Sequence, residues 1–198
     1  MALPCGPADG ILPKIISFPS ARDLRTWLAT HHSEQGGIWL RIYKKDSGVA
    51  TVTYTEALDQ ALCFGWIDGQ KKPFDKQSWL QRFTPRRPRS GWSKRNTGHV
   101  ERLIKSREMA PAGLKEVKAA KADGRWKAAY DSFSQAAVPE DFLNRLAKNK
   151  KAKAFFGTLN KTNLYSILYR LQTAKQPETR EKRLRAIIEM LARGEKFH

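Results

Sequence analysis

The chain has 198 residues, of which 37 are Lys or Arg and 19 are Asp or Glu, so its formal net charge is +18 at pH 7. Hydrophobic residues make up 40% and charged residues 28%, which excludes collagen-like, low-complexity and wholly disordered chains. This length holds one full domain and at most a small second one. The positive charge favours phosphates, nucleic acids, anionic lipid head groups or acidic proteins as partners and disfavours cationic ligands.

The two cysteines, Cys5 and Cys63, have no partners at the spacing of a metal site, so a disulfide framework is excluded and a reducing compartment fits best. No apolar run approaches the ~20 residues of a membrane-spanning helix. Residues 1–19 contain four prolines, lack the pattern of a secretory signal and are predicted to form an extended leader. We expect a cytoplasmic protein with no metal site and no cofactor.

After the leader, the pattern predicts a helix, a strand and a second helix. Ser20 is the predicted N-cap of the first helix, which buries Leu24, Trp27 and Leu28. Residues 38–43 (IWLRIY) alternate as a strand does, with Ile38, Leu40 and Ile42 on one side and Trp39, Arg41 and Tyr43 on the other. Thr53 and Glu56 form a capping box that opens the second helix, which ends at Gly65.

The middle of the chain changes to short extended pieces. Residues 66–83 are predicted to form a β-hairpin or an irregular ribbon. The tract TPRRPRSGW, residues 84–92, is predicted to be a loop, because Pro85 and Pro88 remove backbone donors and restrict the residues before them.

Helices dominate the rest of the sequence. Ser93 or Asn96 can cap a helix whose inward residues are expected to be Val100, Leu103 and Ile104. Pro111 opens another helix, which passes through Leu114, Val117 and Ala120 and ends before Gly124. Residues 131–137 are predicted to be a linker.

Beyond this linker, the sequence predicts a C-terminal helical unit. Pro139 begins a helix with Phe142, Leu143 and Leu146 at helical spacing, and Pro177 begins the last one. Two apolar stripes recur with the same offsets and should pack on each other or on the preceding helices: Leu164, Ile167, Leu168 and Leu171, then Leu184, Ile187, Ile188 and Leu191. We therefore predict a mainly helical α+β protein, with a small β-sheet in an N-terminal domain (20–130) and a three- or four-helix module at 138–198.

The stretch from residue 71 to residue 95 is the most informative for function. It holds nine basic residues against one acid, and the aromatic residues Phe74, Trp79, Phe83 and Trp92 are interleaved with them. Guanidinium groups bind phosphate in a bidentate fork and aromatic faces stack on bases, so this mixture suits an anionic ligand or a nucleic acid. The alternative is that the aromatic residues belong to the core and the basic residues form a solvated rim.

Three other residue types have both a chemical and a structural interpretation. Asp68 could orient an arginine or act as a base, but a turn or ion-pair role is favoured, because a single carboxylate lacks the paired geometry of acid–base chemistry. Cys63 is interpreted as a small core residue rather than a nucleophile. His31 and His32 close the first helix, where positive charge is favoured. Catalytic residues stay unassigned.

Several long motifs resemble one known family. They are FGWIDG, FTPRRPRSGWSKRN and, in the C-terminal part, AKQPETREKR, which is similar to an AKxPETRxxR signature. Over roughly residues 14–197 the sequence resembles the YdeI/OmpD-associated (OmdA-like) family, which is named for bacteriocin protection. The resemblance implies a C-terminal OmdA-like helical module and a role in stress or peptide-antibiotic tolerance, and it implies no settled reaction. The resemblance also implies that the following motif positions form a functional, ligand-binding surface: Trp66, Asp68, Arg82, Arg86, Arg87, Trp92, Ser93, Lys94 and Asn96.

We therefore expect a non-enzymatic binding protein whose basic, Trp-containing loop, residues 82–96, captures a phosphate-bearing or other anionic ligand, with nucleic acid as the favoured polymer. The first alternative is a small enzyme that acts on an anionic substrate with Asp68 or a histidine as acid or base. The second is a protein-interaction module that docks a protein partner through residues 138–198. The sequence names neither the ligand nor the oligomeric state.

Overall fold

The computed structural model describes residues 14–131 and 137–198, and the chain divides into two compact units. Unit 1 contains residues 14–90 together with Asn96–Lys127, and unit 2 contains Gly91–Arg95 together with Ala128–His198. The first 13 residues of the expected leader and residues 132–136 of the expected linker lie outside the described residues. No helix in the described ranges is long and apolar enough to cross a membrane.

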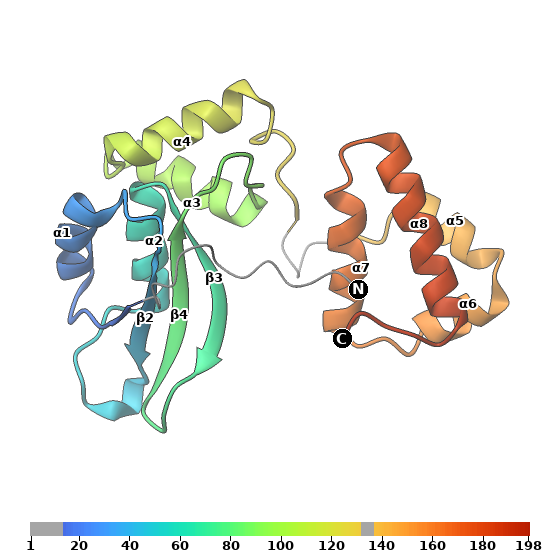
Figure 1. Ribbon diagram of the computed structural model, residues 1–198, viewed down its shortest axis with the longest axis horizontal. Helices are drawn as coiled ribbons and strands as arrows, with labels where there is room; N and C mark the ends of the chain where they lie inside the picture. The colour runs from blue at the N-terminus through green and yellow to red at the C-terminus, as the bar shows by residue number, and fades with distance from the viewer. Residues whose placement is uncertain (1–13, 132–136) are drawn as a thin grey trace. The chain divides into compact units, whose positions relative to one another are not determined.

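Unit 1 is built on a four-stranded mixed sheet with the order β1-β2-β4-β3 (Figure 1). Its strands are β1 (Ile15–Ile16), β2 (Ile38–Tyr43), β3 (Trp66–Pro73) and β4 (Ser78–Pro85). The first strand pairs in parallel with β2, and the hairpin of β3 and β4 adds to the other side of β2 in the antiparallel sense. The predicted strand at residues 38–43 and the predicted hairpin are therefore confirmed.

The two faces of this sheet differ in what covers them. Ile38, Leu40 and Ile42 of β2 are buried and define the inner face, which packs against α1 (Ala21–His31) and α2 (Tyr54–Cys63). The alternate residues Trp39, Arg41 and Tyr43 are half-buried and define the outer face. Since side chains alternate along a strand, the register assigns every paired residue of β3 and β4 to one face or the other.

Local capping signals set the starts of both inner helices. The Ser20 hydroxyl accepts a hydrogen bond from the Asp23 N–H at the start of α1. At the start of α2, Thr53 and Glu56 form both bonds of the predicted capping box. Gly65 follows α2 with a φ of 77°, a left-handed conformation that glycine adopts without strain.

Two expectations about the middle of the chain need correction. Thr84 and Pro85, placed in a loop by the sequence, extend β4, because Pro85 stands at the end of the strand opposite Trp66, where a missing N–H is tolerated. Ile104 was expected to face inward, but its side chain is 37% exposed, because α3 (Lys94–Lys105) buries Val100 and Leu103 instead.

The helix that Pro111 opens is α4 (Pro111–Ala122), as the sequence predicts. It buries Val117 and Ala120, whereas Leu114 is 43% exposed. A Cβ at Gly113 would clash with the Cys63 carbonyl oxygen, so α4 packs closely against the end of α2 and a larger residue there would not fit. Figure 1 shows α3 and α4 at one end of the sheet.

Unit 2 is an all-helical module. Its four main helices are α5 (Glu140–Ala147), α6 (Lys150–Phe156), α7 (Lys161–Gln172) and α8 (Pro177–Ala192). Ile167 and Leu171 of the α7 stripe and all four residues of the α8 stripe lie in one core with residues of α5 and α6, so the two stripes pack together through these residues: Phe142, Leu146, Ala152, Ile167, Leu171, Leu184, Ile187, Ile188 and Leu191. The mainly helical α+β fold with a small N-terminal sheet is therefore confirmed.

The arginines of the AKQPETREKR motif hold unit 2 together. Arg180 donates to both carboxylate oxygens of Asp141, at 2.8 and 2.9 Å, and to the carbonyl oxygen of Leu171 at 2.8 Å. Arg183 donates to the carbonyl oxygen of Arg170 at 2.6 Å. The last carbonyls of α7 have no partner within their own helix, so these two side chains close its C-terminal end.

Candidate anion-binding surface

The nine residues carried over from the motifs divide between the two units. Unit 1 contains Trp66, Asp68, Arg82, Arg86, Arg87 and Asn96, and unit 2 contains Trp92, Ser93 and Lys94. Four of the nine are buried, with exposed fractions of 6% or less: Trp66, Arg86, Trp92 and Asn96. The indole N–H of Trp66 donates to the His32 carbonyl oxygen at 2.7 Å, which shows a packing role for this ring.

Within unit 2, the segment with Ser93 and Lys94 pairs with the chain around Tyr130. Ser93 forms a bridge with Tyr130, and the Lys94 N–H donates to the Tyr130 carbonyl oxygen at 2.8 Å. The Lys94 ammonium lies 2.6 Å from the Asp131 carboxylate. This cation is therefore already neutralised by the chain itself, whereas Arg87, in unit 1, is exposed.

Asp68 and Arg82 lie on opposite faces of the sheet. Asp68 is paired with Phe83 on the inner face, where it accepts a hydrogen bond of 2.8 Å from the Tyr54 hydroxyl. Arg82 is the next residue along β4 and so belongs to the outer face. Asp68 and Arg82 therefore do not point into one shared site.

The outer face places two cations close to one indole ring. Trp39 on β2 is directly opposite Arg82 on β4, and the Arg82 guanidinium carbon lies 5.8 Å from the centre of the ring. The Lys72 ammonium reaches over the same ring from β3, 4.3 Å from its centre. Neither cation is within ion-pair distance of any carboxylate in the described ranges. These three residues, Trp39, Lys72 and Arg82, are called the Trp39 site below.

Arg82 also has an unused hydrogen-bond donor. Its Nη2 donates to the Gly36 carbonyl oxygen at 2.5 Å, but its buried Nη1 has no acceptor among the described residues. Burial lowers the pKa of this guanidinium from its usual value. A buried charged donor without an acceptor is costly, and an oxyanion is the kind of group that would satisfy it.

A second aromatic and cationic group continues the outer face toward the hairpin turn. The Arg41 guanidinium lies 4.4 Å from the ring centre of Tyr43 and 5.0 Å from that of Phe74. Unlike Lys72, however, Arg41 is bound to a carboxylate, that of Asp75, at 2.6 Å. Its Nε donates to the buried Ser78 hydroxyl, so Arg41 stabilises the hairpin.

The inner face holds a similar pair of side chains. The Lys71 ammonium lies 4.2 Å from the ring centre of Trp79, and the Trp79 ring contacts Tyr54 of α2. Lys71 and Lys72 are consecutive in β3, so they point to opposite faces. The chain thus offers two Lys–Trp pairs of the same chemistry, one on each face of the sheet.

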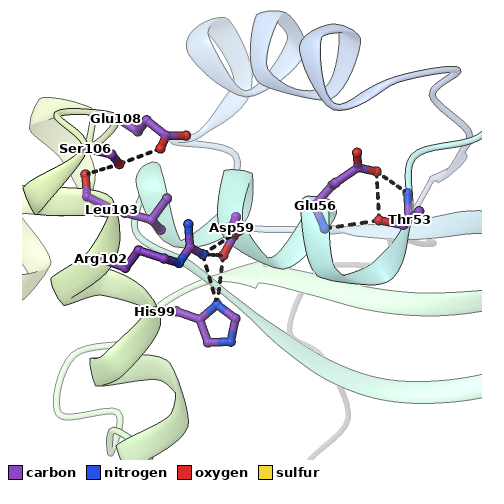
Figure 2. A network of polar contacts seen from close by, with 8 residues as sticks. All are labelled: Thr53, Glu56, Asp59, His99, Arg102, Leu103, Ser106 and Glu108. Carbon is purple, nitrogen blue, oxygen red and sulfur yellow. Dashed lines mark hydrogen bonds and ion pairs between the residues drawn. The ribbon is translucent and has the colours of Figure 1, made fainter.

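The remaining titratable cluster links α2 to α3. Figure 2 shows Asp59, His99 and Arg102 directed toward one another. Arg102 donates to both Asp59 oxygens at 2.6 Å, and His99 Nδ1 lies 2.9 Å from Asp59. Burial raises the pKa of the Cys63 thiol, which agrees with a core residue rather than a nucleophile. Among the described residues, no three His, Cys, Asp or Glu side chains are grouped to hold a metal ion.

Trp39 was not singled out as a site residue from the sequence, although one signal was present. The alternation of IWLRIY already places Trp39, Arg41 and Tyr43 on one side of a strand. What the pattern does not contain is the pairing of β2 with β4, which brings Arg82 across from Trp39.

The comparisons with known proteins separate the two parts of the sequence. Residues 16–116, just over half of the chain, match the model of a family described as a domain of unknown function (DUF8412). Residues 135–194 match the OmdA model, described as Bacteriocin-protection, YdeI or OmpD-Associated. The resemblance to that family is therefore confirmed for the C-terminal module, whereas the FGWIDG and FTPRRPRSGW motifs fall in the other family. No curated protein and no solved structure matches the chain.

Proposed function

The chain belongs to the DUF8412 family and carries an OmdA module, and on that premise we propose that it is a non-enzymatic binding protein for a phosphate-bearing anionic ligand. The OmdA description suggests bacteriocin protection as its biological setting. The ligand binds on the outer face of the sheet rather than along the whole of residues 82–96. Of the residues expected to bind it, Arg82 keeps that role.

The observation that supports this proposal is the state of the cations at the Trp39 site. Most exposed cations of a basic protein are solvated, and many pair with nearby carboxylates, as Lys94 does with Asp131. Lys72 and Arg82 instead lie beside one ring without a carboxylate, and Arg82 has a buried donor without an acceptor. An arriving phosphate would neutralise both charges.

The net charge of +18 acts at longer range. It attracts an anion toward the protein and raises the rate of encounter, and salt screens this attraction. Binding should therefore weaken steadily as the salt concentration rises.

The test is titration calorimetry of the full chain with inorganic polyphosphate at several salt concentrations. Wild type should bind, and the variant Lys72→Ala/Arg82→Gln should bind at least about tenfold more weakly. Lys72→Ala alone serves as a milder variant, since Lys72 is exposed and its removal leaves the Gly36 bond intact.

The matched control is Lys151→Ala/Lys153→Ala, which removes the same number of charges from exposed positions of α6. It should keep affinity within about twofold of wild type. No binding by wild type at low salt would refute the proposal. Equal losses in the two double variants would refute the assignment of the ligand to the outer face.

A further inference from the structure

We infer that the Trp39 site binds single-stranded nucleic acid, with an unpaired base stacked on the indole and the backbone phosphates held by Lys72 and Arg82. This inference rests on the proposed function, because it names the ligand class of the same surface. It is argued from the placement of one aromatic ring and two cations on three neighbouring strands.

The ring is placed where a base can use it. Trp39 is half-buried on β2, in contrast to Trp66 and Trp92, whose exposed fractions are each 1%. Lys72, the side chain over its face, is exposed and has no other partner among the described residues. A lysine held only by a weak cation–π contact leaves the ring readily when a phosphate binds it instead.

The combination of ring and cations distinguishes a nucleic acid from a simple polyanion. A polymer of phosphate or sulfate alone uses the charges and has no group to stack on an indole. A nucleic-acid strand carries both phosphates, which bind the cations, and bases, which stack on the ring. Binding surfaces for single strands combine a line of cations with aromatic side chains on which the bases stack. The second group on the outer face, Tyr43 with Phe74 and Arg41, extends aromatic surface along the same strand direction.

The geometry favours unpaired over paired bases. In a duplex the bases are stacked on one another and only their edges are accessible in the grooves, so an indole on a strand of a sheet cannot stack on their faces. A single strand presents every base face, and each stacked base contributes a sequence-tolerant gain in affinity. The Trp39 site therefore predicts preference for unpaired strands with little preference for sequence.

The chain supplies its own control, since Trp79 with Lys71 has the same chemistry on the inner face. There the ring contacts Tyr54 of α2, so that face is partly occupied by the protein. Loss of Trp79 or Lys71 removes the same kinds of group and the same charge from the same sheet, and it leaves the outer face unchanged.

The experiment measures fluorescence anisotropy of a labelled oligothymidylate of about 15 nucleotides, within the usual range of single-strand sites. The full chain and four variants are compared: Trp39→Leu, Trp39→Phe, Trp79→Leu and Lys71→Ala. Trp39→Leu should weaken binding about tenfold, Trp39→Phe should recover most of this loss, and the two inner-face variants should stay within about twofold of wild type. Circular dichroism verifies that each variant is folded, and Lys72→Ala against Lys71→Ala repeats the comparison at exposed positions.

Polyphosphate and a duplex of the same sequence are the two further probes. Polyphosphate affinity should be unchanged by Trp39→Leu, and the duplex should bind more weakly than the single strand. If polyphosphate binds but Trp39→Leu and Trp79→Leu have equal effects on the oligonucleotide, or the duplex binds more tightly, the inference is refuted and the proposed function stands. If neither polyphosphate nor the oligonucleotide binds wild type, the proposed function itself fails.

Discussion

The two units of this chain use their basic residues in different ways. In unit 2, Arg180 is bound to Asp141 and to the end of α7, and Arg183 is bound to the same helix end. On the outer face in unit 1, Lys72 and Arg82 lie beside Trp39 and no carboxylate in the described ranges pairs with them. The comparison shows that the role of a basic residue follows from whether the chain itself supplies an acceptor for it, and not from its charge alone. By this criterion the arginines of the AKQPETREKR motif have a structural role, and the outer face is the proposed binding surface.

The largest expected effect is a loss of stability in unit 2. Phe142 has no exposed surface and lies in the core of unit 2, so Phe142→Ala should cost about 3–5 kcal/mol of unfolding free energy. Urea denaturation followed by circular dichroism measures this loss. Oligonucleotide binding by the sheet should persist in the variant, and a cost below about 1 kcal/mol would contradict the core assignment.

The next effect concerns the motif arginine itself. Arg180→Ala should cost about 1–3 kcal/mol, because it removes the guanidinium that binds both oxygens of the Asp141 carboxylate and donates to the Leu171 carbonyl. Lys182→Ala, two residues further along α8 and exposed, should stay within about 0.5 kcal/mol of wild type. If both variants lose the same stability, Arg180 has no special structural role.

A capping substitution should have a smaller effect in unit 1. Thr53→Ala removes the hydroxyl that accepts from the Glu56 N–H, at a cost of about 1 kcal/mol. Hydrogen bonds from Thr53 also hold the pKa of the Glu56 carboxyl below its usual value. The larger cause is the Thr53 backbone N–H, which the variant keeps, and the hydroxyl bond adds to it. An NMR titration of the variant should therefore show that pKa rising part of the way toward the usual value, and an unchanged pKa would show that the Thr53 hydroxyl does not bind the Glu56 carboxylate in solution.

The smallest effect is a pH dependence of unit 2. Arg180 lowers the pKa of Asp141, so the folded-state pKa lies below the unfolded-state value. The ion pair therefore stabilises the fold above the usual pKa near 3.8, and this contribution is lost as the pH falls through the lower, folded-state value. Asp141→Asn should remove that acid-sensitive step from urea midpoints measured between about pH 2 and pH 5. A midpoint curve identical to that of wild type would contradict it.

Much of the fold was predictable from local signals. Ser20, Thr53, Pro111 and Pro177 each begin or cap a helix where the sequence places one, because capping depends on residues within one turn. The strand at residues 38–43 followed from its alternation. Ile104 was misassigned because the direction of a helix face depends on the element that packs against it, and spacing alone does not contain that information.

The candidate site was harder to predict because it depends on distant pairs. Lys94 is neutralised by Asp131, 37 positions away, and Trp39 faces Arg82, 43 positions away. Neither pairing can be predicted from the composition of the sequence around these residues. The basic stretch therefore indicated the class of ligand and included Lys72 and Arg82, whereas the ring that brings them together came from a different strand.

The most direct test follows the indole N–H signals of the isotope-labelled protein by NMR while a short oligothymidylate is added. The account predicts that the Trp39 signal and the backbone amides around Lys72 and Arg82 move, while the Trp79 signal stays in place. Movement confined to residues 86–95, or equal movement of Trp39 and Trp79, would contradict the assignment of the binding surface to the outer face of the sheet.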